Sequence, residues 1–142
     1  MIEVLDAHGV EYLIVGAYAM GVFGYTRATG DIDILVRASH ENAGKVMRAL
    51  ESFGAPLNKV SKEDFKKEGM VFQIGVAPLR IDILTSIDGV AFDDIKIERR
   101  EIGGIEAPVI DLDSLLKNKR ATGRLRDLAD CEELEKRCKG AN

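Results

Sequence analysis

The sequence predicts an α+β fold in which helices pack on one mixed β-sheet. Two short strand patterns within the first 36 residues are separated by a helical segment. Four strand patterns between residues 70 and 110 then follow one another without a helix between them. Two helical segments come last. Because strands and helices do not alternate regularly, this order argues against a doubly wound parallel sheet.

Length and composition fit a single domain spanning residues 1–142, which ends in two helices. Hydrophobic residues make up 46% of the chain and charged residues 31%, as in ordinary globular proteins. The formal net charge of −4 argues against a surface that coats nucleic acid. No apolar run approaches the ~18 residues that a membrane span needs, and residues 1–9 are acidic. We therefore expect no membrane segment, no secretory signal and a cytoplasmic location.

The first half of the sequence predicts three helices and two short strands. We expect the helices over residues 2–8, 17–23 and 40–53, and the strands over residues 12–15 and 31–36. Gly9 and Gly54 end the first and third helices, and Ser39 supplies a capping hydroxyl to the third. The strand at 31–36 alternates as a half-buried strand does. Residues 25–30 are predicted as a loop.

The second half of the sequence predicts a short helix, four consecutive strands and two final helices. The capping-box sequence at 61–64 begins the short helix. The strands are expected over residues 70–74, 79–84, 95–102 and 105–110, and the final helices from Asp111 or Asp113 to residue 121 and over residues 124–136. Gly103-Gly104 suits the tight turn of a hairpin between the last two strands. Gly123 separates the two helices.

Asp31 and Asp33 form the first pattern with chemical meaning. They are two residues apart on a strand, so both side chains leave the same face, with ~7 Å between their Cα atoms. A solvated strand face is the common explanation of such a pair. Two crowded carboxylates repel each other, however, and a divalent cation such as Mg²⁺ would remove that repulsion. Asp82 lies in a second Ile-Asp-Ile-Leu segment, and three carboxylates would converge if its strand lies beside residues 31–36.

Gly16 and Ala17 form a second pattern with chemical meaning. A strand that ends in glycine and turns straight into a helix directs free backbone N–H groups outward, which favours an anion such as phosphate. A tight turn with a closely packed helix explains the same two residues without any ligand. A phosphate-binding turn followed by a carboxylate pair is more informative than either feature alone.

Together these residues resemble the polymerase-β-type nucleotidyltransferase superfamily. Its motif begins with a hydrophobic residue followed by Gly and then by either Gly or Ser. After a spacer come an alternating Asp-x-[Asp/Glu] segment and, on a later strand, a third acid. Here Gly16-Ala17 is followed by Asp31-Ile32-Asp33-Ile34, with Asp82 on the later strand. Residues 15–36 are also similar to small bacterial nucleotidyltransferase-like proteins related to abortive-infection toxins, and residues 115–134 to the helices that close those proteins.

The resemblance implies a role for each of these residues. The site would hold two Mg²⁺ ions, for which Mn²⁺ can substitute, and Asp31 and Asp33 would each bind both of them. Asp82 would bind the ion that activates the attacking hydroxyl. Gly16 and the N–H of Ala17 would hold the phosphates of the nucleotide. Two cations ~3.5–4 Å apart can hold the attacking and leaving oxygens of an in-line displacement. Asp82 is also a candidate to accept the proton of the nucleophile, and both roles remain open.

Four further residues are candidate nucleotide contacts, namely Arg27, Thr29, Lys119 and Arg124. The loop that contains Arg27 and Thr29 must lie beside Asp31. The other two belong to a basic run without an intervening acid, which consists of Lys117, Lys119, Arg120, Arg124 and Arg126. On one helix, residues 117, 120 and 124 would share a face, and 119 and 126 another. A solvated helical surface is the alternative explanation, and Asp127 and Asp130 are expected to orient neighbouring cations.

The predicted function is metal-dependent transfer of an NMP from an NTP to an acceptor hydroxyl, with release of pyrophosphate. An RNA end, a small hydroxylated molecule and a protein side chain all remain open as acceptors. The acceptor would meet the C-terminal helices, a second copy of the chain or a partner protein, as in a toxin–antitoxin pair. Ala17 departs from the Gly or Ser of the family motif. This departure favours the alternative, a catalytically inactive member that binds nucleotide or a partner protein.

Overall fold

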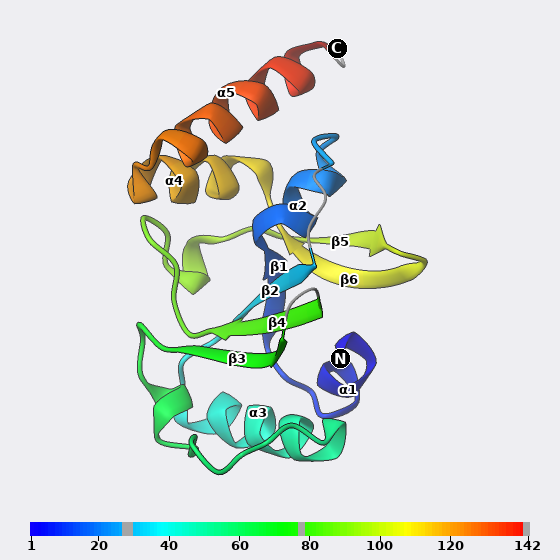
Figure 1. The fold of residues 1–142 in the computed structure, drawn as a ribbon, viewed down its shortest axis with the longest axis vertical. Helices are drawn as coiled ribbons and strands as arrows, with labels where there is room; N and C mark the ends of the chain where they lie inside the picture. Colours follow the sequence, from blue (N-terminus) through cyan, green and yellow to red (C-terminus); the bar gives the residue numbers. More distant parts are fainter. Residues whose placement is uncertain (27–29, 77–78, 141–142) are drawn as a thin grey trace.

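The fold is known from a computed structural model, which describes residues 1–26, 30–76 and 79–140. Five α-helices, six strands and two 3₁₀ turns occur in this part of the chain (Figure 1). In chain order they are α1 (Ile2–Ala7), β1 (Tyr12–Val15), α2 (Gly16–Val22), β2 (Asp31–Val36), α3 (His40–Phe53), η1 (Asp64–Lys66), β3 (Val71–Val76), β4 (Leu79–Leu84), η2 (Phe92–Asp94), β5 (Ile97–Ile102), β6 (Ile105–Ile110), α4 (Leu112–Thr122) and α5 (Leu125–Gly140).

One mixed sheet organises the molecule, with strand order β3-β4-β2-β1-β6-β5. The β2–β4 and β1–β6 pairs are parallel, whereas β1–β2, β3–β4 and β5–β6 are antiparallel. The central strand β1 is buried along its whole length, as expected for a strand with neighbours on both sides and helices on both faces. The predicted α+β fold with a mixed sheet is therefore confirmed.

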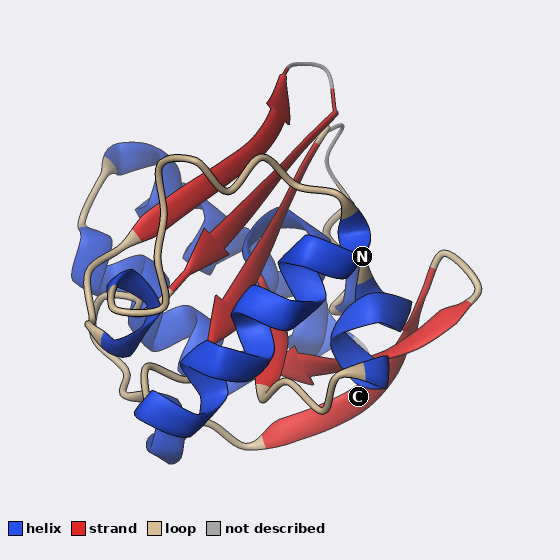
Figure 2. Ribbon diagram, turned by 90° about the horizontal axis from the view of Figure 1, so that it is seen from below, coloured by secondary structure: helices blue, strands red, loops and turns tan. Residues whose placement is uncertain are grey.

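The helices form two groups on opposite sides of the sheet. In Figure 1, α3 lies below the strands and α1, which contacts it, lies at the lower right beside β3, whereas α2, α4 and α5 lie toward the top. Figure 2 shows the β5–β6 hairpin extending to one side of the other strands. Within the described residues, no helix is both long enough and apolar enough to cross a membrane.

Local capping explains where the main helices begin and end. The hydroxyl of Ser39 accepts a hydrogen bond from the backbone N–H of Asn42, and Gly54 ends α3 in the left-handed region with φ +88°. The carboxylate of Asp111 caps α4 in the same way, and Gly123 ends it with φ +69°. A left-handed residue at 123 turns the chain, so α4 and α5 are two packed helices.

Four predicted elements differ clearly from those observed, whereas the bounds of the others agree to within one residue. The capping box at 61–64 does form, since the N–H of Ser61 donates to Asp64 at 2.9 Å, but it is followed by one 3₁₀ turn and not by an α-helix. The strand predicted at 70–74 continues to Val76, because Gly75 pairs with Arg80 and does not form the turn. The η2 turn delays the start of β5 to Ile97, and α5 extends to Gly140.

Candidate active site

The three predicted acids lie together on one face of the sheet. Strands β2 and β4 are parallel neighbours, and their register places Asp31 opposite Arg80 and Asp33 opposite Asp82. Because side chains alternate along a strand, all four of these residues share a face. They line a cleft of about 370 Å³ together with Gly16 and residues of the two last helices.

Gly16 lies in direct contact with the acidic cluster. Its φ of +72° is in the left-handed region, where only glycine is unstrained. A Cβ atom at this position would lie 2.2 Å from Oδ2 of Asp33, which is closer than any real contact. The sharp turn from β1 into α2 therefore requires glycine. It also brings Ala17 to the wall of the cleft.

The electrostatic environment of Asp33 disfavours its charged form. Burial of the carboxyl, reinforced by the negative charges of Asp82 and Asp31, raises the pKa of Asp33 to about 6. The positive charge of Lys119 acts in the opposite direction and offsets only part of the effect. The cluster is therefore a place where an additional cation would be stabilised.

Arg80 is a cleft residue that the sequence analysis did not select. Its Nη2 lies 3.0 Å from Oδ2 of Asp31, and its Nε lies 3.2 Å from Oδ1 of Asp82. One guanidinium thus contacts two of the three acids. A signal was present, since Arg80 precedes Asp82 by two residues and must share its face. Its opposition to Asp31, however, depends on the β2–β4 register.

The acidic cluster fits a hard divalent cation by its donor chemistry. Carboxylate oxygens are the ligands that Mg²⁺ takes in proteins. Oδ1 of Asp82 is buried and has no hydrogen bond from the described residues. In residues 1–26, 30–76 and 79–140, no three acidic, histidine or cysteine side chains stand close enough to enclose an ion. The side chains would therefore have to turn for the cluster to hold a metal.

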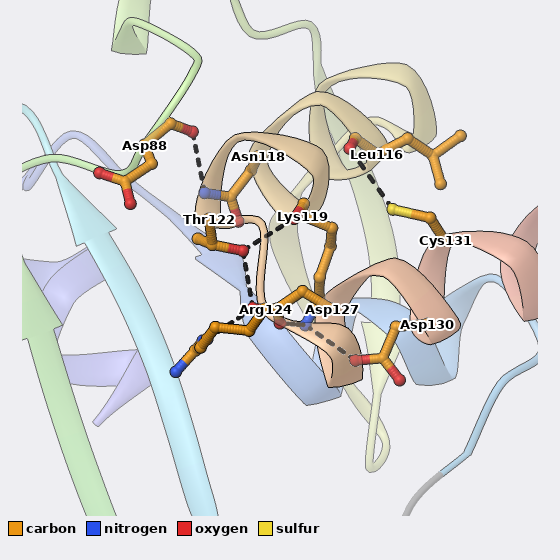
Figure 3. A network of polar contacts seen from close by, with 9 residues as sticks. All are labelled: Asp88, Leu116, Asn118, Lys119, Thr122, Arg124, Asp127, Asp130 and Cys131. Carbon is orange, nitrogen blue, oxygen red and sulfur yellow. Dashed lines mark hydrogen bonds and ion pairs between the residues drawn. The ribbon is translucent and has the colours of Figure 1, made fainter.

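The part of the cleft that is formed by α4, α5 and the joint between them is mostly basic. Lys119, Arg124 and Arg126 line it. The Nζ of Lys119 is largely buried, 3.4 Å from Oδ1 of Asp127 and 3.2 Å from Oδ2 of Asp130 (Figure 3). These carboxylates hold the lysine, as expected from the sequence. Arg126 was noted only as part of the basic run, and its place in the cleft depends on the start of α5.

Asp127 joins the two last helices. Its Oδ2 accepts hydrogen bonds from Thr122 Oγ1 at 2.7 Å and from Arg124 Nε at 2.6 Å, as Figure 3 shows. Burial acts to raise the pKa of Asp127, but the hydrogen bonds from Thr122 and Arg124 and the charge of Lys119 outweigh it, and the pKa is lowered. The Arg124 side chain is 76% exposed, so its guanidinium faces solvent at the rim of the cleft.

The basic run does not form one helical surface. Gly123 divides it, with Lys117, Lys119 and Arg120 on α4 and Arg126 on α5. The expected grouping of residues 117, 120 and 124 is therefore wrong, because their spacing assumed a continuous helix. Arg120 forms an ion pair with Glu135 of α5. The candidates Arg27 and Thr29 lie outside the described residues.

Among the solved structures similar to this one are nucleotidyltransferases. TM1012 of Thermotoga maritima, whose assignment as a nucleotidyltransferase is provisional, is 17% identical, with a TM-score of 0.56 over 94% of this chain and 87% of that one. The lincosamide antibiotic adenylyltransferase LnuA, with lincomycin bound, is 15% identical, with a TM-score of 0.56 over 94% and 90%. The antibiotic-resistance factor ANT(2'')-Ia is 14% identical, with a TM-score of 0.61 over 99% and 80%.

These likenesses show that the chain shares the fold of solved nucleotidyltransferases, as the sequence resemblance implied. No protein-family model matches the chain. No curated protein matches it by sequence either. The fold does not by itself establish an activity, so the functional conclusion depends on the cleft.

Proposed function

We propose that the chain is a metal-dependent nucleotidyltransferase that moves an NMP from an NTP to an acceptor hydroxyl and releases pyrophosphate. One observation carries the proposal. The β2–β4 register sets Asp33 beside Asp82, with Asp31 on the same face and Gly16 against Asp33. Mutually repelling carboxylates are costly to gather on one face, and a resident cation would explain why this fold gathers them.

In this proposal the three acids hold divalent cations, either Mg²⁺ or Mn²⁺. When bound, such cations stabilise the attacking and leaving oxygens of an in-line displacement. Asp31, Asp33 and Asp82 supply the oxygen ligands. Asp82 is the most deeply buried of the three acids, with an 11% exposed side chain, and it either binds a cation or accepts the proton of the acceptor hydroxyl.

The nucleoside triphosphate would lie between the acidic and the basic residues of the cleft. The Gly16–Ala17 turn is small enough for phosphates to approach its backbone. Arg124 and Arg126 face the cleft from the other side, and arginine suits the geometry of phosphate groups. Lys119 adds a fixed positive charge whose position is set by Asp127 and Asp130. Arg27 and Thr29 remain proposed nucleotide contacts.

The acceptor class that we favour is a small hydroxylated molecule. LnuA, which shares the fold, is an antibiotic adenylyltransferase with lincomycin bound. An RNA end and the hydroxyl of a partner protein, as in a toxin–antitoxin pair, are the other acceptor classes to be tested. A second copy of the chain could complete the acceptor site.

The decisive experiment follows transfer of label from α-³²P-labelled NTPs. The protein is incubated with Mg²⁺ and, separately, with small hydroxylated antibiotics, cellular RNA and cellular protein. We expect labelled product with one acceptor class, and its loss in Asp33→Asn and Asp82→Asn but not in Asp94→Asn, an acid outside the cleft. Release of pyrophosphate, which accompanies transfer to any acceptor, gives a second readout that does not require the labelled product to be identified.

The rival is a catalytically inactive member of the fold that binds nucleotide or a partner protein. Ala17, which lacks the serine hydroxyl, and Arg80, which is bound to two of the acids, favour it. Titration calorimetry with NTPs, with and without Mg²⁺, separates the two functions when it is combined with the label-transfer assay. Metal-dependent NTP binding without label transfer or pyrophosphate release would establish the rival.

A further inference from the structure

We infer that Arg80 is a built-in cation that competes with divalent metal for the acidic cluster and thereby limits metal affinity. The inference rests on the proposed function, because it concerns the same three acids. Its basis is the position of one guanidinium on the side chains that would bind the metal.

The contacts of Arg80 occupy ligand atoms on both strands. Nη2 lies 3.0 Å from Oδ2 of Asp31 and 3.5 Å from Oδ2 of Asp82, while Nε lies 3.2 Å from Oδ1 of Asp82. At this distance the guanidinium occupies the position from which a metal cation would approach the same carboxylate oxygen. A divalent ion could therefore bind Asp31 and Asp82 together only after the guanidinium moves away.

The contact between Arg80 and Asp82 is also poorly aligned. Nε of Arg80 and Oδ1 of Asp82 are both buried, and neither has a hydrogen bond within the described residues, although only 3.2 Å separates them. Charge attraction without hydrogen-bond alignment stabilises a buried pair incompletely. The Arg80 side chain is 34% exposed, so it can turn toward solvent when a stronger cation arrives.

The β2–β4 register fixes the position of Arg80 beside two of the acids. Arg80 is opposite Asp31 and two residues before Asp82, so its side chain leaves the sheet between the two acids. A lysine at this position would carry the same charge as a single point and would not reach both carboxylates as a planar guanidinium does. Arginine is thus the stronger competitor.

The test measures Mn²⁺ affinity by titration calorimetry, without nucleotide and without reference to activity. We compare the parent protein with Arg80→Gln, Arg80→Lys and Arg100→Gln, the last of which removes a positive charge on β5 that pairs with Glu98. We expect Arg80→Gln to bind Mn²⁺ about tenfold more tightly, Arg80→Lys to lie between it and the parent, and Arg100→Gln to match the parent.

If the parent protein binds Mn²⁺ and Arg80→Gln binds it equally well or more weakly, the inference that Arg80 competes with metal is wrong. The proposed metal site is not affected by that result. Absence of Mn²⁺ binding from every variant would overturn both the metal site and this inference. If Arg80→Gln does not fold, Arg80→Lys decides, since it keeps a charge beside the acids. Tighter binding by the lysine variant supports competition, and unchanged or weaker binding refutes it.

Discussion

Gly16 illustrates how one residue joins the fold to the site. Its left-handed backbone and the closeness of Asp33 each require glycine at this position, and they do so independently. A glycine after a buried strand was visible in the sequence, but its contact with the acid was not. That contact depends on the antiparallel β1–β2 register, which sets Val15 opposite Asp33.

Gly16→Ala should destabilise the protein by about 3 kcal/mol, because a left-handed alanine costs ~1–2 kcal/mol and its Cβ would also collide with Asp33. Urea unfolding measures the change. Gly9→Ala is the matched control, since Gly9 has φ +66° but no atom within 4 Å of the added Cβ. A Gly16 variant no less stable than the Gly9 variant would contradict the steric argument.

Ala17 tests whether phosphates approach the turn. One neutral hydrogen bond contributes ~0.5–1.5 kcal/mol, so Ala17→Ser should tighten NTP binding in Mg²⁺ by up to about tenfold, and Ala17→Gly should be near neutral. Ala17→Val should weaken it strongly, because its branched Cβ intrudes on the turn. Titration of all three variants measures these affinities. NTP binding by the valine variant equal to that of the parent would place the phosphates elsewhere.

Asp33 allows a direct test of the acidic cluster. Asp33→Asn removes a carboxylate that is close to Asp31 and Asp82, so without divalent cations the variant should be about 1–2 kcal/mol more stable at neutral pH. In the parent, Mg²⁺ or Mn²⁺ should raise the melting temperature by a few degrees, and more with NTP present, since ligands stabilise the state that binds them. The variant should lose this rise. A rise of equal size in both proteins would exclude these acids as the metal site.

At the scale of secondary-structure elements, four strands and the break at Gly123 between α4 and α5 could be predicted from the sequence, whereas the direction of α5 after that break could not. Strands β1, β2, β4 and β6 have the predicted bounds, because alternation or buried runs bounded by glycine or aspartate are local signals. The capping box at 61–64 was recognised, but whether an α-helix follows depends on later packing. The spacing of the basic run groups residues 117, 120 and 124 only on a continuous helix, whereas the left-handed backbone of Gly123 changes the direction of the chain.

Asp127 is the residue on which that joint depends. Its pKa is lowered in the folded protein, so its contribution to stability is complete above the ordinary aspartate pKa of 3.8 and is lost as the pH falls through the lower, folded value. Asp127→Asn should cost about 2 kcal/mol at pH 7, because a buried acceptor of two hydrogen bonds loses its charge. Unfolding measured from pH 7 to pH 2 should show a smaller acid-induced loss in the variant. Parallel pH profiles for the two proteins would refute this role.

At the scale of the whole molecule, the three acids could be predicted to converge only on the condition that β2 and β4 are neighbours. The sequence shows two strands with the same Ile-Asp-Ile-Leu segment, but strand order is a long-range property. Arg80 was missed for the same reason, since its contact with Asp31 follows from the register and not from the sequence pattern. Arg126 was missed as a cleft residue because it required the direction of α5.

The parallel β2–β4 pair has a consequence for how quickly the chain folds. Asp33 and Asp82 are partners in the register although they are 49 positions apart in the sequence, and pairs so distant along the chain form late because the intervening loop must close first. Repulsion between the acids then belongs mainly to the native state and little to the folding transition state. Asp33→Asn should accordingly slow unfolding while leaving the refolding rate nearly unchanged, and stopped-flow denaturant jumps would show the difference in a single limb of the chevron.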